Sequence, residues 1–456
     1  MVDILIKNGT VVPVNKDRSI VENGAIAIHN GKIVDVGPTA NLARKYSAAD
    51  KIIDANRMAV LPGLINTHTH LLQNFIKGFR DDVPLLEWAE RVSIPRIIIV
   101  VKDYLSGNFG LQYHATMLGC IEAIKSGTTC LANMEWATHA NALKAYRETG
   151  IRADHALYFA DQDLLGALVP EARLTHDQTL KLANEIISKW HNAENGRIKF
   201  RYGVCSPTTC SESLIKEVRE LANKTKIKIH CHLGETKLEK NAIEEKYGKS
   251  QVEWLREIGL LGPDVLAAHC IWLSDREIKI LKETQTKVSH NPESNMKLAS
   301  GIAPIVKMLK QGVTIGLASD GCASNDNMDM FEAMRTAALL HKVANLDASV
   351  LSAYDVLEMA TINGARALGL ENQVGSLELG KKADIILVDL TPAHLRPIHD
   401  IVNNLVYCAW GSDVKTVIID GKTVMENRKM MTIDEEKAVD KAEEFGIARF
   451  KQEGLE

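Results

Sequence analysis

Three features are missing from this sequence, and each absence excludes a class of protein. Its eight cysteines include no Cys-x-x-Cys pair, which argues against a disulfide framework or a cysteine-based zinc site and fits a reducing cytosol. The most apolar run, "IIIVV" at 97–101, is too short to cross a bilayer. A formal net charge of −4 gives no basic excess for binding phosphates. We therefore expect a soluble cytoplasmic protein with neither a membrane nor a nucleic acid as its partner.

Both ends of the chain show the alternating pattern of short β-strands joined by tight turns. Asn30 and Asp420 each precede a glycine, and both dipeptides are strong hairpin signals. We expect residues 1–57 and 371–432 to fold together into one small β-sandwich. The remaining C-terminal segment, 433–456, has helical spacing with charged partners four residues apart, which predicts a surface helix.

Between these ends, over residues 58–370, apolar strand-like runs alternate with amphipathic helical patterns. Repeated strand–helix units favour a parallel sheet covered by helices, and eight of them in about 300 residues favour a (β/α)8 barrel over a doubly wound sheet. The predicted fold class is therefore α/β, a TIM-like barrel with a small composite β-sandwich. The predicted barrel strands are 59–66, 127–133, 152–159, 198–204, 226–232, 264–269, 286–290 and 313–319.

Side chains that can bind a metal or carry protons fall at the ends of four predicted strands. In a (β/α)8 barrel these ends meet at one opening, where such barrels hold their active sites. The first group is a His-x-His pair, and residues two apart on a strand point to the same side. One such residue alone is more often structural, but the whole set at one opening favours a common site. The set is His68 and His70, His232 with Glu235, His269, and Asp320.

The chemistry of these side chains predicts a hydrolytic metal site. Neutral imidazoles and one carboxylate suit a borderline divalent ion, and they leave room for a water molecule whose pKa the ion lowers toward about 7. Glu235 lies just beyond His232 and is placed to move the proton of that water. His269 is suited to polarise the electrophile, and Asp320 to bind both metal and water. His230 remains a competing ligand, although the His-x-x-Glu spacing favours His232.

Longer motifs in the same regions resemble the amidohydrolase superfamily, namely "PGLINTHTH", "HLGET", "AAHC", "SHNPESNMKLASGIAPIVKML", "GLASDGCASNDNMDMFEAMRTAALLHK" and "GSLELGKKADIILVDL". More narrowly, they look like the group of S-adenosylhomocysteine/methylthioadenosine deaminases and s-triazine hydrolases. The resemblance implies one divalent metal per chain, Zn2+ with Fe2+ as the alternative, a homodimer or larger oligomer, and hydrolytic displacement at a ring carbon of an N-heterocycle. It carries metal ligation onto His68, His70, His232 and Asp320, and proton transfer onto Glu235 and His269.

Further residues are expected to contact the substrate. By the same resemblance, Gln73 in "HTHLLQ" matches a pocket glutamine of the triazine hydrolases, and Ser324 matches a substrate-contacting position. Trp88 fits the pocket mouth as well as it fits simple packing. His290 ends the seventh predicted strand, which favours a pocket role over a packing role. The predicted substrate-binding set is Gln73, Trp88, Glu235, His269, His290 and Ser324.

Three positions depart from the nucleoside deaminases of this group. Where those enzymes usually carry His, Arg and Glu, this chain has Cys205, Tyr158 followed by Phe159, and Arg96. The usual residues would hold a ribose and its 5′ substituent. Their replacement predicts that compact bases or triazines are better substrates than 5′-modified adenosines.

The leading hypothesis is an aminohydrolase that replaces an exocyclic amino group of a triazine, purine, pyrimidine or pterin with hydroxyl. One alternative is an s-triazine chlorohydrolase, which shares the first step but releases chloride. Another is a deaminase of S-adenosylhomocysteine, methylthioadenosine or 5′-deoxyadenosine. A non-catalytic binding barrel is disfavoured because every expected metal ligand is present. The His-x-Glu and Pro-Cys-x-x-Cys signature of zinc cytidine deaminases is absent, which excludes that unrelated fold.

Overall fold

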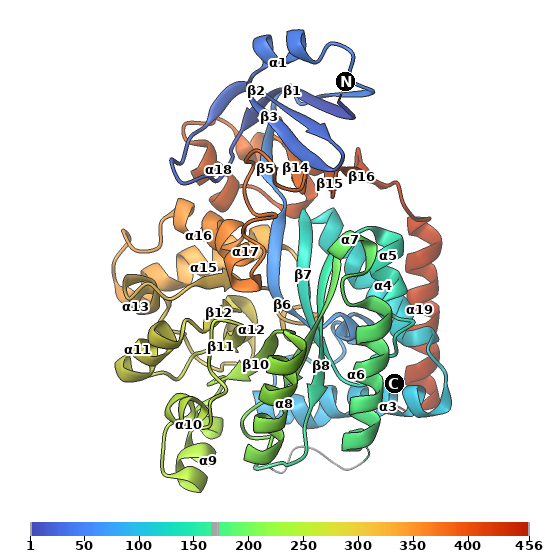
Figure 1. Cartoon of the computed structure of the whole chain (residues 1–456), viewed down its shortest axis with the longest axis vertical. Coiled ribbons are helices and arrows are strands. Elements are labelled where there is room, and N and C mark those ends of the chain that lie inside the picture. The colour runs from blue at the N-terminus through green and yellow to red at the C-terminus, as the bar shows by residue number, and fades with distance from the viewer. Residues whose placement is uncertain (1, 166–170, 172, 455–456) are drawn as a thin grey trace.

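The computed structural model describes residues 2–165, 171 and 173–454, and these residues form two sheets surrounded by helices (Figure 1). One sheet is parallel and has eight strands in the order β13-β12-β11-β10-β9-β8-β7-β6. Its strands are β6 (Leu64–Thr69), β7 (Thr128–Glu135), β8 (Arg152–Phe159), β9 (Ile198–Val204), β10 (Ile229–Leu233), β11 (Val265–His269), β12 (Lys287–His290) and β13 (Ile315–Leu317).

This parallel sheet curves into a nearly closed barrel, so the predicted (β/α)8 fold is confirmed. The two edge strands β6 and β13 come together through side chains. The Asn66 amide donates to the Ser319 hydroxyl at 2.7 Å, and the Thr67 hydroxyl donates to the Leu317 carbonyl at 3.0 Å. Strands β7 and β8 are buried along their whole length, as expected for parallel strands covered on both faces.

The predicted strand 59–66 is wrong as one element, because the chain divides it between the two sheets. Residues up to Pro62 form β5 (Met58–Pro62), which pairs with the second sheet, and β6 begins the barrel at Leu64. Gly63 lies between them, where a Cβ atom would come within 2.1 Å of the Thr129 side chain. The close approach to Thr129 requires glycine there, and a continuous apolar pattern does not show where one sheet ends.

The second sheet is mixed and is built from both ends of the chain. Its order is β17-β16-β15-β14-β5-β1-β2-β3, with β4 beside β1. The strands hydrogen-bond into one continuous sheet and not into the two sheets of the predicted sandwich. The predicted origin of this small β domain from both ends of the chain is confirmed. Its strands are β1 (Ile4–Val11), β2 (Val21–His29), β3 (Lys32–Pro38), β4 (Lys51–Asp54), β5, β14 (Ile385–Asp389), β15 (Val414–Ile419), β16 (Lys422–Glu426) and β17 (Lys429–Met430).

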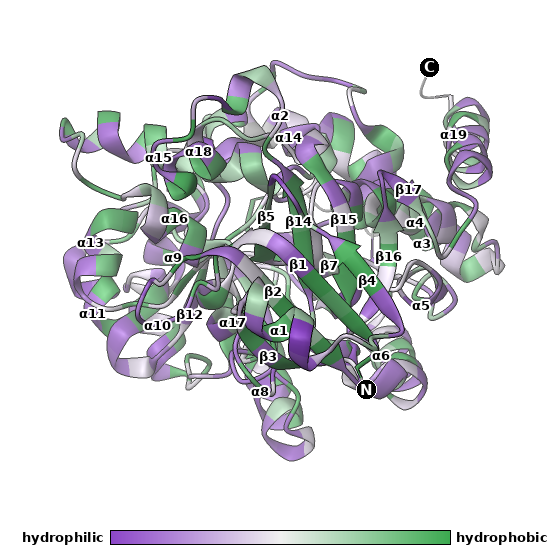
Figure 2. Cartoon of the chain, turned by 90° about the horizontal axis from the view of Figure 1, so that it is seen from above, coloured by the Kyte–Doolittle hydropathy of each residue, from purple (hydrophilic) through white to green (hydrophobic). Residues whose placement is uncertain are grey.

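Helices cover the barrel from outside, and several begin at serine or threonine capping boxes, as α6, α9, α11 and α16 do. Figure 2 shows hydrophobic residues gathered along the central strands and hydrophilic residues on the outward helix faces. The helices are α1 (Thr39–Lys45), η1 (Leu71–Ile76), α2 (Leu85–Trp88), η2 (Ala89–Ser93), α3 (Ile94–Ser106), α4 (Gly110–Lys125), α5 (Lys144–Thr149), α6 (His176–Trp190), α7 (Ala193–Gly196), α8 (Glu212–Thr225), α9 (Lys237–Tyr247), α10 (Gln251–Glu257), α11 (Asp275–Thr284), α12 (Pro292–Lys297), α13 (Ile305–Lys310), α14 (Cys322–Asn325), α15 (Met330–Asn345), α16 (Ala353–Met359), α17 (Ile362–Leu368), η4 (Ala393–Leu395), α18 (Ile401–Tyr407), η5 (Gly411–Asp413) and α19 (Glu435–Gln452).

The C-terminal helix α19 forms where the charge pattern predicts it and lies beside α4 (Figure 1). The Arg449 guanidinium, which is mostly buried, donates to Asp103 of α3 at 2.7 Å and ties this helix to the barrel. Within the described part of the chain, no helix has the length and apolar character needed to cross a membrane.

Candidate active site

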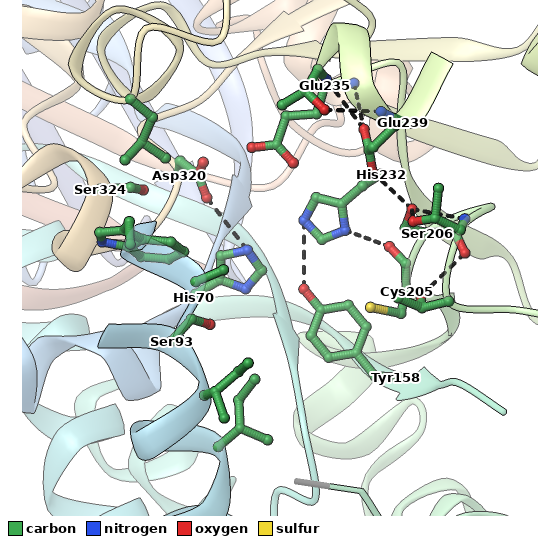
Figure 3. Close-up of a pocket in the computed structure, with 18 of the residues that line it drawn as sticks. His70, Ser93, Tyr158, Cys205, Ser206, His232, Glu235, Glu239, Asp320 and Ser324 are labelled. Carbon is green, nitrogen blue, oxygen red and sulfur yellow. Dashed lines mark hydrogen bonds and ion pairs between the residues drawn. The ribbon is translucent and has the colours of Figure 1, made fainter. Parts of the chain in front are cut away.

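The chemistry-bearing residues meet at the C-terminal ends of the barrel strands (Figure 3). The ligand-type nitrogens of His68, His70 and His232 lie within 4.8 Å of one another. Asp320 follows β13, and its Oδ1 atom is 3.5 Å from His68 Nε2 and 3.4 Å from His70 Nε2. His269 ends β11 and completes a second close group with His68 and Asp320. Four imidazoles and a carboxylate therefore converge on one small volume.

Hydrogen bonds to backbone carbonyls orient two of these imidazoles. His70 Nδ1 faces the Met134 carbonyl, and His232 Nδ1 faces the Cys205 carbonyl at 2.6 Å. Because a carbonyl oxygen only accepts, both Nδ1 atoms carry the proton, which leaves the Nε2 lone pairs directed at the shared volume. His68 Nε2 is fully buried without any hydrogen-bond partner in the structure. A divalent ion fits this set of donors and would give His68 Nε2 its missing partner.

Burial keeps the imidazoles of His68 and His232 neutral, which is the form that binds a metal. Desolvation, with the neighbouring histidines, lowers the pKa of His68 well below its ordinary value. The same causes lower the pKa of His232 to about 3. The Asp320 carboxyl behaves in the opposite way, because His269 and His70 outweigh its burial and lower its pKa. The site thus combines neutral nitrogen ligands with an ionised carboxylate.

Asp320 is held in a backbone conformation that few residues adopt. Its φ is +64°, and that of His269 is +73°, both in the left-handed region. Such conformations are costly and gather at functional sites. The Ser294 hydroxyl donates to Asp320 Oδ2 at 2.7 Å, and the Gly321 N–H donates to Oδ1 at 2.8 Å, which fixes the carboxylate.

Glu235 faces this group with a carboxyl suited to proton transfer. Burial raises its pKa to about 7, although the nearby His269 opposes the shift. Glu235 Oε2 lies 3.9 Å from His269 Nε2. Burial alone would lower the pKa of His269, but Glu235 and Asp320 raise it above its ordinary value. A carboxyl that titrates near pH 7 can take up and release a proton during turnover.

A cavity of about 190 Å³ opens in front of these groups. Gln73, Trp88 and Ser324, three of the residues expected to contact a substrate, line it. The backbone of Ala323 fixes both Gln73 and Trp88. The Ala323 N–H donates to Gln73 Oε1 at 3.1 Å, and Trp88 Nε1 donates to the Ala323 carbonyl at 3.0 Å. Much of the remaining wall is apolar, formed by Ile94, Ile97, Trp136, Leu165 and Leu298.

Two other histidines singled out in the sequence lie behind the cavity wall. His290 is fully buried, and its Nε2 pairs with His341 Nε2 at 2.9 Å, so it does not line the cavity. Its strand ends where expected, but the side chain turns toward α15. His230 is also fully buried, with its Nε2 3.0 Å from His68 Nδ1. It therefore contacts an expected ligand rather than the shared volume.

Several residues of the site escape the sequence analysis. Ser294 and Asn295 hold Asp320 and His269, the latter through Asn295 Oδ1 at 2.9 Å from His269 Nδ1. Both lie in "SHNPESN", close to the predicted substrate contact His290, and their polar character is the only signal in the sequence. Trp136 packs on Tyr158 with ring centroids 4.8 Å apart, and both rings line the cavity. Nothing local in the sequence separates Trp136 from a core tryptophan.

Comparison with known proteins gives a consistent result. Residues 59–424 match the amidohydrolase family, and residues 24–46 match an imidazolonepropionase-like composite domain of bacteria. A 5′-deoxyadenosine deaminase of Methanosarcina acetivorans is 44% identical over 444 residues, 97% of each chain. The structure of an adenosine deaminase from Xanthomonas campestris with bound zinc has a TM-score of 0.90 and 31% identity, covering 99% of both chains. A triazine hydrolase from Arthrobacter aurescens has a TM-score of 0.88 and 25% identity, covering 98% of this chain and 99% of that chain.

Proposed function

Because the chain belongs to the amidohydrolase family and is a hydrolase of carbon–nitrogen bonds in heterocycles, we propose that it removes the 6-amino group of an adenine nucleoside without a 5′-hydroxyl. The observation that carries the proposal is the convergence of His68, His70, His232 and Asp320 opposite Glu235. The substrate class is supported by the match with the 5′-deoxyadenosine deaminase, which extends over 97% of both chains.

In the proposed reaction, His68, His70, His232 and Asp320 would hold one divalent ion, which would activate a water molecule for attack on a ring carbon. Zinc is the proposed ion, and the zinc-bound structure of the Xanthomonas campestris enzyme supports that choice. Ser294 keeps the Asp320 carboxylate in place. The Nδ1 hydrogen bonds of His70 and His232 hold their rings with Nε2 turned inward.

Glu235 and His269 carry the proton chemistry in this proposal. The Glu235 carboxyl takes the proton from the attacking water and passes it to the ring nitrogen next to the reacting carbon, because its pKa of about 7 lets it do both at neutral pH. His269 is held through Asn295 and lies 3.9 Å from both Glu235 and Asp320. It is placed to stabilise negative charge on the oxygen that has attacked the ring carbon. The remaining proton of that oxygen then passes through Glu235 to the amino group, so that ammonia leaves and a carbonyl forms.

The apolar cavity wall supports a substrate whose outer end is not polar. Ile94, Ile97, Trp136, Leu165 and Leu298 offer few hydrogen bonds to a 5′-hydroxyl. A 5′-deoxy or 5′-thioether group loses no hydrogen bond on entering such a wall, whereas a hydroxyl does.

A compact N-heterocycle such as a triazine is the second candidate. It is favoured by the replacement of three expected nucleoside contacts with Cys205, Tyr158 and Arg96, and by the likeness to triazine hydrolase. The sequence-based prediction that compact heterocycles react faster belongs to this second candidate. Release of chloride instead of ammonia would identify the chlorohydrolase form of this candidate.

A substrate panel decides between the two candidates. The zinc-loaded protein is assayed with 5′-deoxyadenosine, methylthioadenosine, adenosine, adenine, melamine and atrazine, following ammonia and chloride. We expect a 5′-modified adenosine to have the highest kcat/KM, with Glu235→Gln inactive as the control for site-dependent turnover. A kcat/KM for any compact heterocycle at least about tenfold above every nucleoside would replace the first candidate by the second.

The assembly and location of the protein are also part of this proposal. We propose one zinc ion per chain, a homodimer, and a cytoplasmic enzyme, in line with the resemblance and the unpaired arrangement of all eight cysteines. Metal analysis of the purified protein and its mass in solution test the first two points.

A further inference from the structure

One arginine in the cavity wall has hydrogen-bonding capacity that the protein itself does not use. Arg96 lies on α3, lines the cavity and is 3% exposed. Its Nη1 donates to Glu135 Oε2 at 3.0 Å, while its Nε is buried with no partner. Among the residues that the structure describes, this bond to Glu135 is the only hydrogen bond of the guanidinium. Buried arginine donors are normally satisfied, so the free edge needs an acceptor from elsewhere.

Glu135 fixes the position of this arginine. It is fully buried at the end of β7, and its Oε1 accepts from the Leu72 N–H at 2.7 Å. One carboxylate thus holds both Arg96 and the start of η1, the helix that follows His70. A guanidinium anchored at one edge presents its remaining N–H groups in a fixed direction, which is the arrangement suited to a directed contact.

The surroundings of Arg96 show which kind of acceptor fits. Arg96 is the only lysine or arginine among the described residues that line the cavity, while Glu235, Glu239 and Asp320 line it as acids. The charge of Arg96 is already balanced by Glu135, so a negatively charged substrate group gains little there and meets three carboxyl groups. Neutral acceptors such as hydroxyl oxygens fit this environment better than a carboxylate or a phosphate.

A second polar side chain, that of Ser93, lies next to Arg96 in the cavity wall. Ser93 lies three residues before Arg96, on the same side of the helical segment, and both line the cavity. The Ser93 side chain makes no capping hydrogen bond to α3. Figure 3 shows it directed to the space between His70 and Tyr158. Their neighbours in the wall, Ile94 and Ile97, are apolar. Ser93 and Arg96 therefore form a polar strip within an apolar surface.

We propose that Arg96, anchored by Glu135, binds the vicinal hydroxyls of the substrate's ribose through its free N–H edge. This inference rests on the proposed nucleoside substrate and names the residue that replaces the contacts missing from this chain. From the sequence alone, Arg96 indicates that the glutamate expected to contact the sugar has been lost. In this proposal, Arg96 held by Glu135 provides a different contact to the sugar.

The test pairs a conservative variant with two substrates that differ only in the sugar hydroxyls. Arg96→Lys keeps a positive charge beside Glu135, which protects the fold, but loses the planar second edge. Arg91→Lys is the matched control, because Arg91 is an exposed arginine on the same segment, and its ion pair among the described residues is with Glu87. Each protein is assayed with 5′-deoxyadenosine and with 2′,3′,5′-trideoxyadenosine, and Tm confirms folding.

We expect Arg96→Lys to lower kcat/KM for 5′-deoxyadenosine at least about tenfold while changing that for the trideoxy analogue less than about threefold. Arg91→Lys should behave as the unmodified protein does. Equal losses on both substrates would overturn the proposal, because Arg96 would then act only by holding the wall. If the unmodified protein deaminates neither nucleoside but does act on a triazine, the proposed function is wrong and the sugar contact is rejected with it.

Discussion

His230 contacts a predicted metal ligand from behind, and its removal should weaken metal binding by a measurable amount. Its Nε2 lies 3.0 Å from His68 Nδ1, and burial lowers the pKa of His230 well below its ordinary value, so the ring is neutral and can accept. His68 then keeps its proton on Nδ1 and its lone pair on Nε2. His230→Phe retains a ring in this fully buried position but leaves the His68 Nδ1 proton without an acceptor.

The expected size of the effect follows from two independent figures. Partners of metal-binding histidines are worth about 10–100-fold in metal affinity, which corresponds to about 1.4–2.7 kcal/mol. A buried donor left without an acceptor costs about 1–3 kcal/mol, and His68 can escape this cost only by moving its proton to the metal-facing Nε2. We therefore expect the Kd for zinc, measured by competition with a chromophoric chelator, to rise about 10–100-fold.

His341→Phe is the matched control for this experiment. It breaks another buried histidine pair, His341 Nε2 to His290 Nε2 at 2.9 Å, which lies outside the cavity. Its zinc Kd should stay within about twofold of the unmodified protein. Unchanged zinc affinity in His230→Phe, or an equal loss in both variants, would refute the view that His230 orients His68.

Three further predictions concern the metal and the buried charges. Asp320→Ala removes a ligand and the partner of Ser294, and we expect less than about a tenth of the original kcat with any substrate, since metal activation of water is worth many kcal/mol; higher activity would contradict its assignment. Dialysis against dipicolinate should abolish turnover, and stoichiometric zinc should restore it; activity that survives complete removal of metal, checked by elemental analysis, would disprove a metal site. Glu293→Gln should raise Tm at pH 8 but not at pH 5, because burial raises the pKa of Glu293 to about 7. Ionisation of Glu293 begins to destabilise the folded state above its ordinary pKa near 4.5, and above pH 7 it costs up to about 3 kcal/mol. An equal change in Tm at both pH values would count against this.

The parts of the fold that the sequence reveals are those governed by local pattern. Seven of the barrel strands form within a few residues of their predicted positions, as β8 (Arg152–Phe159) shows, because long apolar runs bounded by turn residues have few alternatives. His68, His70, His232, His269 and Asp320 could be grouped because strand ends of a parallel barrel share one face. The predicted barrel topology therefore allowed residues far apart in the sequence to be grouped into a single candidate site.

What the sequence could not show depends on contacts between distant segments. The division at Gly63 depends on pairing of β5 with β14, which no local pattern records. The inward or outward turn of a side chain after a strand end is decided by its neighbours, and for His290 the neighbour is His341 of α15. Arg96 takes its meaning from Glu135, thirty-nine positions away, whose buried carboxylate holds it at the cavity wall.

The single glycine between β5 and β6 has a consequence for how the protein matures during synthesis. Leu61 in β5 pairs with Ile386 in β14, so this strand lacks its antiparallel partner until nearly the whole chain has left the ribosome. Closing so long a loop is slow and opposed by chain entropy. His68 and His70 follow a few residues later on β6, and Asp320 arrives only with β13. Strand β6, which carries the histidines, therefore follows a strand that lacks one of its partners until β14 has been made. A chain that stops before residue 385 should neither finish the small sheet nor retain zinc.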